Sequence, residues 1–312
     1  MFLIGGLEQT RISFRFLNKK IPYRHGTGKI KKSFDNANYS IFRKECQVKV
    51  LSLFDGISCG MVALERAGIP IEEYSAFEID KYATKISEKN YPKIKRYGDV
   101  FDGDFGKFKG YDLLIGGSPC TYWSIAKKSR ETTTDGKGFR LFMQYVRALE
   151  ESGCKHFLYE NNFSIHRNIK DEISKRLGVQ PIMINSALLS AQQRKRCYWT
   201  NIPNVTQPVD KEIMLIDILE SGMPVNAING KSRTIKAQYS RTGPANALRG
   251  DGFGATMVHD GQALRKLSPV EAERLQTLPD NYTAGISNTQ RYKCIGNGWT
   301  VDVIAHILKN MK

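Results

Sequence analysis

The segment from residue 48 to residue 80 constrains the fold more than any other part of the chain. Val48–Phe54 is an apolar run that predicts a buried strand, and the glycine-bearing turn 55–60 leads into a helical pattern that ends at Gly68. A second strand pattern, 74–79, carries acidic residues at its end. This order is the general layout of a nucleotide-binding βαβ unit. Many doubly wound folds contain such a turn without a nucleotide, so the pattern indicates the fold more specifically than it indicates a nucleotide ligand.

Acidic residues after the early strands suggest what this unit could bind. The turn lacks the Gly-x-Gly-x-x-Gly spacing, so a dinucleotide is not its natural ligand. Glu78 can accept both ribose hydroxyls of a single adenosine. Asp99, in the short edge 98–101, could accept from an adenine amino group or could cap a turn. The local sequence leaves both roles of Asp99 open.

A cysteine follows the next strand pattern, the apolar run 111–115. The turn 116–120 reads Gly-Gly-Ser-Pro-Cys, which brings Cys120 to the carboxyl edge of the sheet, where open α/β sheets build their sites. Pro119 fixes φ at about −65° and holds the backbone before the thiol. A thiolate in this place is a candidate nucleophile. A small, half-buried cysteine after a strand is the alternative on this stretch alone.

Two further groups of polar residues fall at the same predicted edge. The strand pattern 156–162 ends in Glu160 and two asparagines, and acids are depleted in strands, which favours a chemical role for Glu160. Gln192, Arg194 and Arg196 share one face at strand spacing and could grip an anion. A basic, solvated face is the alternative for that row.

Charge and cysteine usage indicate the partner and the compartment. The 312 residues carry a formal net charge of +16, which favours polyanions, nucleic acid first. The six cysteines form no Cys-x-x-Cys pair, which argues against a zinc site and a disulfide framework and suits a reducing cytosol. Residues 1–7 lack the basic start of a signal peptide, and no apolar run reaches the ~20 residues that span a bilayer. We expect a cytoplasmic protein that has no membrane association and no metal.

The chain divides into four parts. Residues 1–47 are a basic, aromatic extension that could grip phosphates or could be merely a poorly ordered tail. Residues 48–202 hold the strand and helix alternation, with a polar stretch, 121–138, that predicts a lid or an idle loop. The alternation breaks over 203–264, which indicates a small inserted module. Residues 265–312 return to helices and complete the large domain.

The motifs, taken in order, resemble those of the cytosine-5 DNA methyltransferase family. The carrying residues are Phe54 to Gly60, Pro119-Cys120, Glu160-Asn161-Asn162, the row Gln192-x-Arg194-x-Arg196, Arg265 to Pro279, and Gly296-Asn297-Gly298. The match runs from about 48 to 312 and leaves 1–47 and 203–264 uncovered. Three places depart from the usual pattern: Asn162 replaces Val, Gly298-Trp299 replaces Ser-Val, and Thr121 to Ser124 replace Gln-x-x-Ser.

The resemblance implies a doubly wound, mostly parallel sheet and a role for each matched residue. It implies catalytic roles for Cys120, Glu160 and Arg194 and S-adenosyl-L-methionine as the cofactor. The residues implied to bind the cofactor are Phe54, Asp55, Gly56, Ile57, Glu78, Ile79, Asp99, Val100, Asn297 and Trp299. The residues implied to bind the substrate are Ser118, Asn161, Gln192 and Arg196. Residues 203–264 take the place of the target-recognition region.

The expected reaction is methyl transfer to carbon 5 of a cytosine flipped out of double-stranded DNA. One alternative is the same chemistry on transfer RNA, and another is a catalytically silent DNA-binding homologue. The intact Cys120, Glu160 and Arg194 argue against the silent homologue. The family context points to a bacterial or phage-encoded enzyme. The target sequence and a restriction endonuclease partner leave no mark in the sequence.

Overall fold

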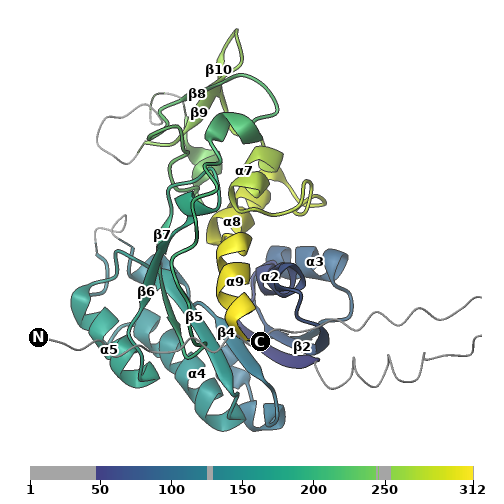
Figure 1. Cartoon of the computed structure of the whole chain (residues 1–312), viewed down its shortest axis with the longest axis vertical. Helices are drawn as coiled ribbons and strands as arrows, with labels where there is room; N and C mark the ends of the chain where they lie inside the picture. The colour runs from purple at the N-terminus through teal and green to yellow at the C-terminus, as the bar shows by residue number, and fades with distance from the viewer. Residues whose placement is uncertain (1–46, 125–128, 244, 246–253, 312) are drawn as a thin grey trace, which may run out of the picture.

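A computed structural model of the chain describes residues 47–124, 129–243, 245 and 254–311. The basic extension, apart from its last residue, and Arg249 of the predicted target-recognition region lie outside the described residues. Figure 1 shows a large lobe built on a sheet and a smaller lobe at the opposite end of the long axis. The yellow C-terminal helices run from the small lobe back to the large one.

In the part of the chain that the structure describes, a seven-stranded sheet forms the centre of the large lobe. Its strand order is β3-β2-β1-β4-β5-β7-β6. Its strands are β1 (Val48–Leu53), β2 (Ile71–Phe77), β3 (Lys95–Tyr97), β4 (Leu113–Gly116), β5 (His156–Asn162), β6 (Ile182–Asn185) and β7 (Lys195–Thr200). The first five are parallel, and β7 runs antiparallel between β5 and β6. The doubly wound, mostly parallel fold is confirmed. Its strand order reverses beside β1 and β4, which is where ligands bind in such sheets.

Helices cover both faces of this sheet (Figure 1). α2 (Cys59–Ala67), α3 (Lys81–Asn90) and α9 (Val301–Leu308) share one apolar core with the sheet, and α4 (Lys137–Ser152) and α5 (Arg167–Leu177) share the other. α9 packs along α2, the helix that begins at the first turn. α7 (Pro269–Leu275) and α8 (Asn288–Asn297) lead from the small lobe into α9.

Local hydrogen bonds and backbone angles set several element boundaries. β6 stops at Asn185, because the Asn185 side chain accepts from the Ala187 N–H and caps a short 3-10 turn. The edge expected over 98–101 is instead such a turn, capped by Asp99. α7 ends at Leu275, shortly before Thr277, which takes a left-handed φ of 53°.

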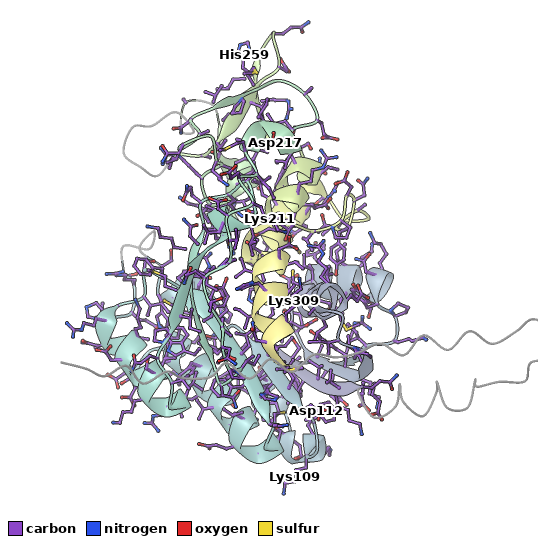
Figure 2. All side chains as sticks on the ribbon, viewed as in Figure 1. Lys109, Asp112, Lys211, Asp217, His259 and Lys309 are labelled. Carbon is purple, nitrogen blue, oxygen red and sulfur yellow. The ribbon has the colours of Figure 1, made fainter. Side chains whose placement is uncertain are left out.

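The small lobe holds an antiparallel sheet of β8 (Met223–Val225), β9 (Met257–His259) and β10 (Leu264–Lys266). Its apolar core also includes residues of α7 and α8, so the core draws on both sides of the boundary expected at 264. In Figure 2, His259 marks the far tip of this lobe, and Lys109 and Asp112 mark the opposite end of the molecule. No helix among the described residues has the length and apolar character needed to cross a membrane.

Candidate active site

Cys120 lies beyond the carboxyl end of β4, at the start of a 3-10 turn, Cys120–Tyr122. The approach to this turn needs a glycine, because a Cβ on Gly117 would lie 2.8 Å from the Glu160 carbonyl oxygen. Ser118 is buried and fixes the turn to β5, since its hydroxyl bonds the Tyr159 hydroxyl at 2.7 Å and its carbonyl accepts from the Asn161 amide at 3.1 Å. Ser118 and Asn161 therefore position Cys120, which is itself only half-buried.

Glu160, on the neighbouring strand, is held by two donors. Arg196 Nε lies 2.8 Å from Glu160 Oε1, and Trp299 Nε1 donates to Oε2 at 3.0 Å. The Arg196 contact follows from the antiparallel pairing of β5 with β7, which sets Arg196 opposite Asn162, two residues along from Glu160. About an eighth of each side chain of the ion pair is exposed, so solvent screens the pair weakly.

Gln192 and Arg194 precede β7, so the expected row of three on one face of a strand does not form. The Arg194 guanidinium donates to three backbone carbonyls, those of Ile235 at 3.3 Å, Gly296 at 3.2 Å and Gly298 at 2.9 Å. Gln192 accepts from the Ile235 N–H at 2.7 Å. Both side chains thus join the small lobe and the C-terminal turn to the large sheet. Burial lowers the pKa of Arg194 to about 10, which leaves the guanidinium charged at neutral pH.

A cavity of about 680 Å³ lies between the two lobes and opens at these residues. Cys120, Arg194 and Arg196 line it from the large lobe, and Ile235 lies on the small-lobe side. The basic and amide side chains Arg233, Lys236 and Gln238 line the same side. A cavity of this size accommodates a drug-sized ligand, and therefore a single base. The nucleophile candidate and the predicted target-recognition region consequently face one space.

The turn after β1 and the end of β2 form a second part of the site. Glu78 accepts three backbone N–H groups, from Gly56 at 2.8 Å, Ile79 at 2.9 Å and Asp80 at 2.7 Å. Burial raises the pKa of Glu78. Gly56 has a φ of 60° and faces open space, and the Ile79 side chain is 74% exposed beside the carboxylate. An oriented acid, an open turn and an exposed apolar side chain fit the ribose and adenine of S-adenosyl-L-methionine.

Two other predicted cofactor residues, both acidic, make hydrogen bonds within their own turns. The Asp55 carboxylate accepts from the hydroxyls of Ser52 at 2.7 Å, Ser58 at 2.5 Å and Tyr74 at 2.7 Å, so Asp55 shapes the turn from within. Burial raises the pKa of Asp55. Asp99 Oδ1 accepts from the Phe101 N–H at 3.0 Å, so Asp99 caps the short turn that follows it.

The remaining predicted cofactor residues lie at the two cores or at the interlobe cavity. Phe54 takes a left-handed φ of 57° at the end of β1, and Ile57 and Val100 are buried in the two cores. Asn297 is exposed and lines the interlobe cavity. No group of three or more His, Cys, Asp or Glu side chains suited to a metal ion occurs among the residues that the structure describes.

Sequence reasoning missed Gln276, which is fully buried at the end of α7. Its side-chain amide donates to Ile295 O at 2.8 Å and to Gly298 O at 3.1 Å, and accepts from Gln192 at 3.2 Å. Gln276 therefore supports the same C-terminal turn as Arg194. A glutamine after a helix is common, and only the fold shows what surrounds it.

The mostly parallel sheet and its carboxyl-edge site define an α/β methyltransferase fold. The model of the family C-5 cytosine-specific DNA methylase matches residues 48–214 and 185–312, so the chain belongs to this family. The family predicted from the sequence is confirmed, and with it the enzyme class, DNA (cytosine-5-)-methyltransferase.

Relatives and solved structures agree with this assignment. The chain is 28% identical over 317 residues to Type II methyltransferase M1.ScrFI of Lactococcus lactis subsp. cremoris, covering 86% of this chain and 79% of the relative. It is 27% identical to Type II methyltransferase M.NlaX of Neisseria lactamica, over 85% and 96% of the two chains. The solved methyltransferase EhMeth of Entamoeba histolytica shares the fold, with a TM-score of 0.67 and 19% identity over 85% of this chain and 98% of that one.

Proposed function

We propose that this chain transfers a methyl group from S-adenosyl-L-methionine to carbon 5 of a cytosine flipped out of double-stranded DNA, through a covalent bond to Cys120. One observation supports this most: Cys120, Arg194 and Arg196 line a single cavity whose size suits a base, and Glu160 is ion-paired to Arg196 at that cavity. The family membership supports DNA as the substrate.

The chemistry explains why these side chains are needed. Carbon 5 of cytosine is a poor nucleophile, and a thiolate adding at carbon 6 turns the ring into an enamine whose carbon 5 can attack. Glu160 would hold ring N3 and the exocyclic amino group and supply the N3 proton, so that the enamine can form. Arg194 would steady the ring carbonyl and also hold the Gly296–Gly298 turn. A base then removes the carbon 5 proton, and the thiol departs.

The cofactor supplies the electrophilic methyl group. Glu78 would accept the ribose hydroxyls, Ile79 would cover the adenine, and Gly56 would let the backbone approach the ligand closely. Phe54, Ile57, Asp99, Val100, Asn297 and Trp299 complete the proposed cofactor surroundings. Asp55 would act through the turn that it holds.

The direct test is bisulfite sequencing of DNA from a host that expresses the protein, with methyl incorporation into transfer RNA measured in parallel. We expect protected cytosines in one sequence context of the DNA and none where Cys120 is replaced. Methyl groups found in transfer RNA alone would contradict the proposed substrate. Because the substrate is genomic DNA, we propose a cytoplasmic site of action in a bacterium or phage-infected cell. Two relatives are named type II methyltransferases, so we also propose a restriction endonuclease as a partner.

Replacing Glu78 with alanine should weaken S-adenosyl-L-methionine binding by about 1–3 kcal/mol, because a charged acceptor is removed from a partly buried site. Isothermal titration calorimetry without DNA measures this directly. Glu72 is a matched control, since it is an exposed acid on β2, the strand that Glu78 follows, and it is paired with Lys49 at 3.6 Å. Asp99→Ala should also weaken binding, and equal affinities for Glu78→Ala and Glu72→Ala would refute the cofactor assignment.

Sequence specificity should reside in the small lobe, because side chains that read flanking bases must come from outside the shared motifs. Arg233 lines the cavity and bonds the Asn226 side chain at 3.2 Å, and Arg241 is exposed nearby in the chain. Arg233→Ala or Arg241→Ala should relax the flanking preference by about 1–3 kcal/mol per base pair in bisulfite reads. Arg167→Ala, on the outer helix α5, is the control. An unchanged sequence context in both small-lobe variants would place the reading elsewhere, for example in the basic extension 1–47, which we expect to grip phosphates.

A further inference from the structure

Trp299 stands where the family pattern commonly has valine, and it makes a contact that valine cannot make. Its indole Nε1 donates to Glu160 Oε2 at 3.0 Å, on the carboxylate oxygen not used by Arg196. Gly117 leaves room for this contact, since a Cβ there would lie 3.1 Å from Glu160 Oε2 and 3.5 Å from Trp299 Nε1. The two donors thus hold one oxygen each and fix the plane of the carboxylate.

The backbone on both sides of Trp299 is anchored. The Gly298 carbonyl accepts from Arg194 at 2.9 Å and from Gln276 at 3.1 Å. The Thr300 hydroxyl donates to Gln276 at 2.8 Å and pairs with the Ser186 hydroxyl at 2.9 Å. Trp299 therefore projects from a fixed turn, so its backbone cannot move away from Glu160 unless buried hydrogen bonds break.

The same turn also borders the cofactor side of the site. A Cβ on Gly298 would lie 3.3 Å from the Cys59 sulfur, at the first residue of α2, which follows the 55–60 turn. Trp299 packs against the core that contains Ile57 and Cys59. It thus lies between the predicted cofactor turn and the carboxylate that serves the base.

We propose that Trp299 is a positioning residue for Glu160, which it orients for proton delivery to the target cytosine in addition to any contact with the cofactor. This inference rests on the proposed function. Arg194 would then also affect the reaction indirectly, because it holds the turn that carries Trp299. Arg196 contacts Glu160 directly, and the charge of Glu160 also acts on Arg194, Cys197, Tyr198 and Tyr159 nearby. All belong to β5 or to the segment ending in β7, so Trp299 is the donor that reaches it from the C-terminal turn.

A reaction that needs no cofactor separates the two roles of Trp299. When the Cys120 thiolate adds to carbon 6 and Glu160 delivers a proton to N3, carbon 5 can take a proton from water. Loss of the original carbon 5 proton to a base, return of the N3 proton to Glu160 and departure of the thiolate then regenerate cytosine. The net change is exchange of the carbon 5 hydrogen with solvent, which can be followed as tritium release from labelled DNA without S-adenosyl-L-methionine.

Trp299→Phe keeps an aromatic ring but removes the N–H donor together with the five-membered ring that carries it. We expect cofactor-free exchange to slow about tenfold or more, because a hydrogen bond to a charged group is lost, while DNA affinity stays unchanged. Trp299→His, which keeps a ring N–H, should recover part of the rate. Normal exchange in Trp299→Phe together with weaker cofactor binding would show that Trp299 serves the cofactor alone. No exchange by the wild-type protein would instead refute the proposed function itself.

A spectroscopic measurement tests the contact without catalysis. The chain has three tryptophans, so ¹⁵N-indole labelling gives three side-chain signals, and Trp299→Phe identifies one of them. In Glu160→Gln that signal should move upfield, because an amide oxygen is a weaker acceptor than a carboxylate. The signals of Trp123 and Trp199 serve as internal controls. An unmoved Trp299 signal would overturn the proposal, even if Trp299→Phe failed to fold.

Discussion

Replacing Cys120 with serine should abolish methyl transfer while leaving DNA binding and the fold intact. The covalent step needs a thiolate, and a serine hydroxyl without an adjacent base is a far weaker nucleophile. The side chain is half-exposed at the end of a short turn, so the substitution removes little packing. Turnover measured with labelled S-adenosyl-L-methionine and a DNA duplex should fall to background.

The other described cysteines are poor rivals for this role. Burial raises the pKa of Cys59 and of Cys294 to about 12, and it also raises the pKa of Cys154 and Cys197. At neutral pH these four remain thiols, which are neither nucleophilic nor accessible. Among the described cysteines, this leaves Cys120, which follows β4, as the candidate nucleophile.

Trapping with 5-fluorocytosine in DNA tests the covalent step separately. A base cannot remove fluorine from carbon 5 as it removes a proton, so the Cys120 thiolate cannot depart. The enzyme therefore stays attached, and the complex survives denaturation. Wild type and a Cys154→Ala control should form this complex, and Cys120→Ser should not. An adduct in the Cys120→Ser variant would mean that another residue is the nucleophile.

The sequence predicts the large lobe well because its signals are local. Apolar runs, the glycine that ends α2 and the Ser268–Glu271 capping box are each read from a few neighbouring residues, and each occurs in the structure. The strand patterns 111–115 and 156–162 likewise place Cys120 after one strand and Glu160 near the end of another, as β4 and β5 show. What residues 48–116 build is therefore largely decided within short windows of sequence.

Contacts between distant segments are harder to predict. The row at 192–196 has strand spacing, yet Gln192 bridges to Ser232 and Arg194 turns to three carbonyls, because the segment 232–235 pairs there instead. No periodic pattern in the sequence predicts the pairing of Gln192 with Ser232. The Trp299 indole likewise meets Glu160 across 139 residues of chain. The boundary expected at 264 also divides a packed core, since the core of the small lobe includes side chains from α7 and α8.

Replacing Glu160 with glutamine should lower the rate of methyl transfer about 10²–10⁴-fold, the range typical of general acid–base groups. Glutamine has nearly the same shape and can still accept from Trp299 Nε1, but it cannot give a proton to ring N3. Single-turnover kinetics with saturating DNA and cofactor isolate this step. Glu150→Gln, at an exposed position of α4, is the matched control.

The same substitution also removes the partner of Arg196, and this second effect must be separated from the first. Arg196 would remain largely buried with a charge whose nearest carboxylate, at 2.8 Å, is gone, which commonly costs about 3–5 kcal/mol of stability. Thermal unfolding measures this loss, and assays well below the lowered Tm keep it out of the kinetics. If the folded Glu160→Gln protein transferred methyl groups at the wild-type rate, Glu160 would serve only to hold Arg196. N3 protonation would then have to come from another group at the cavity.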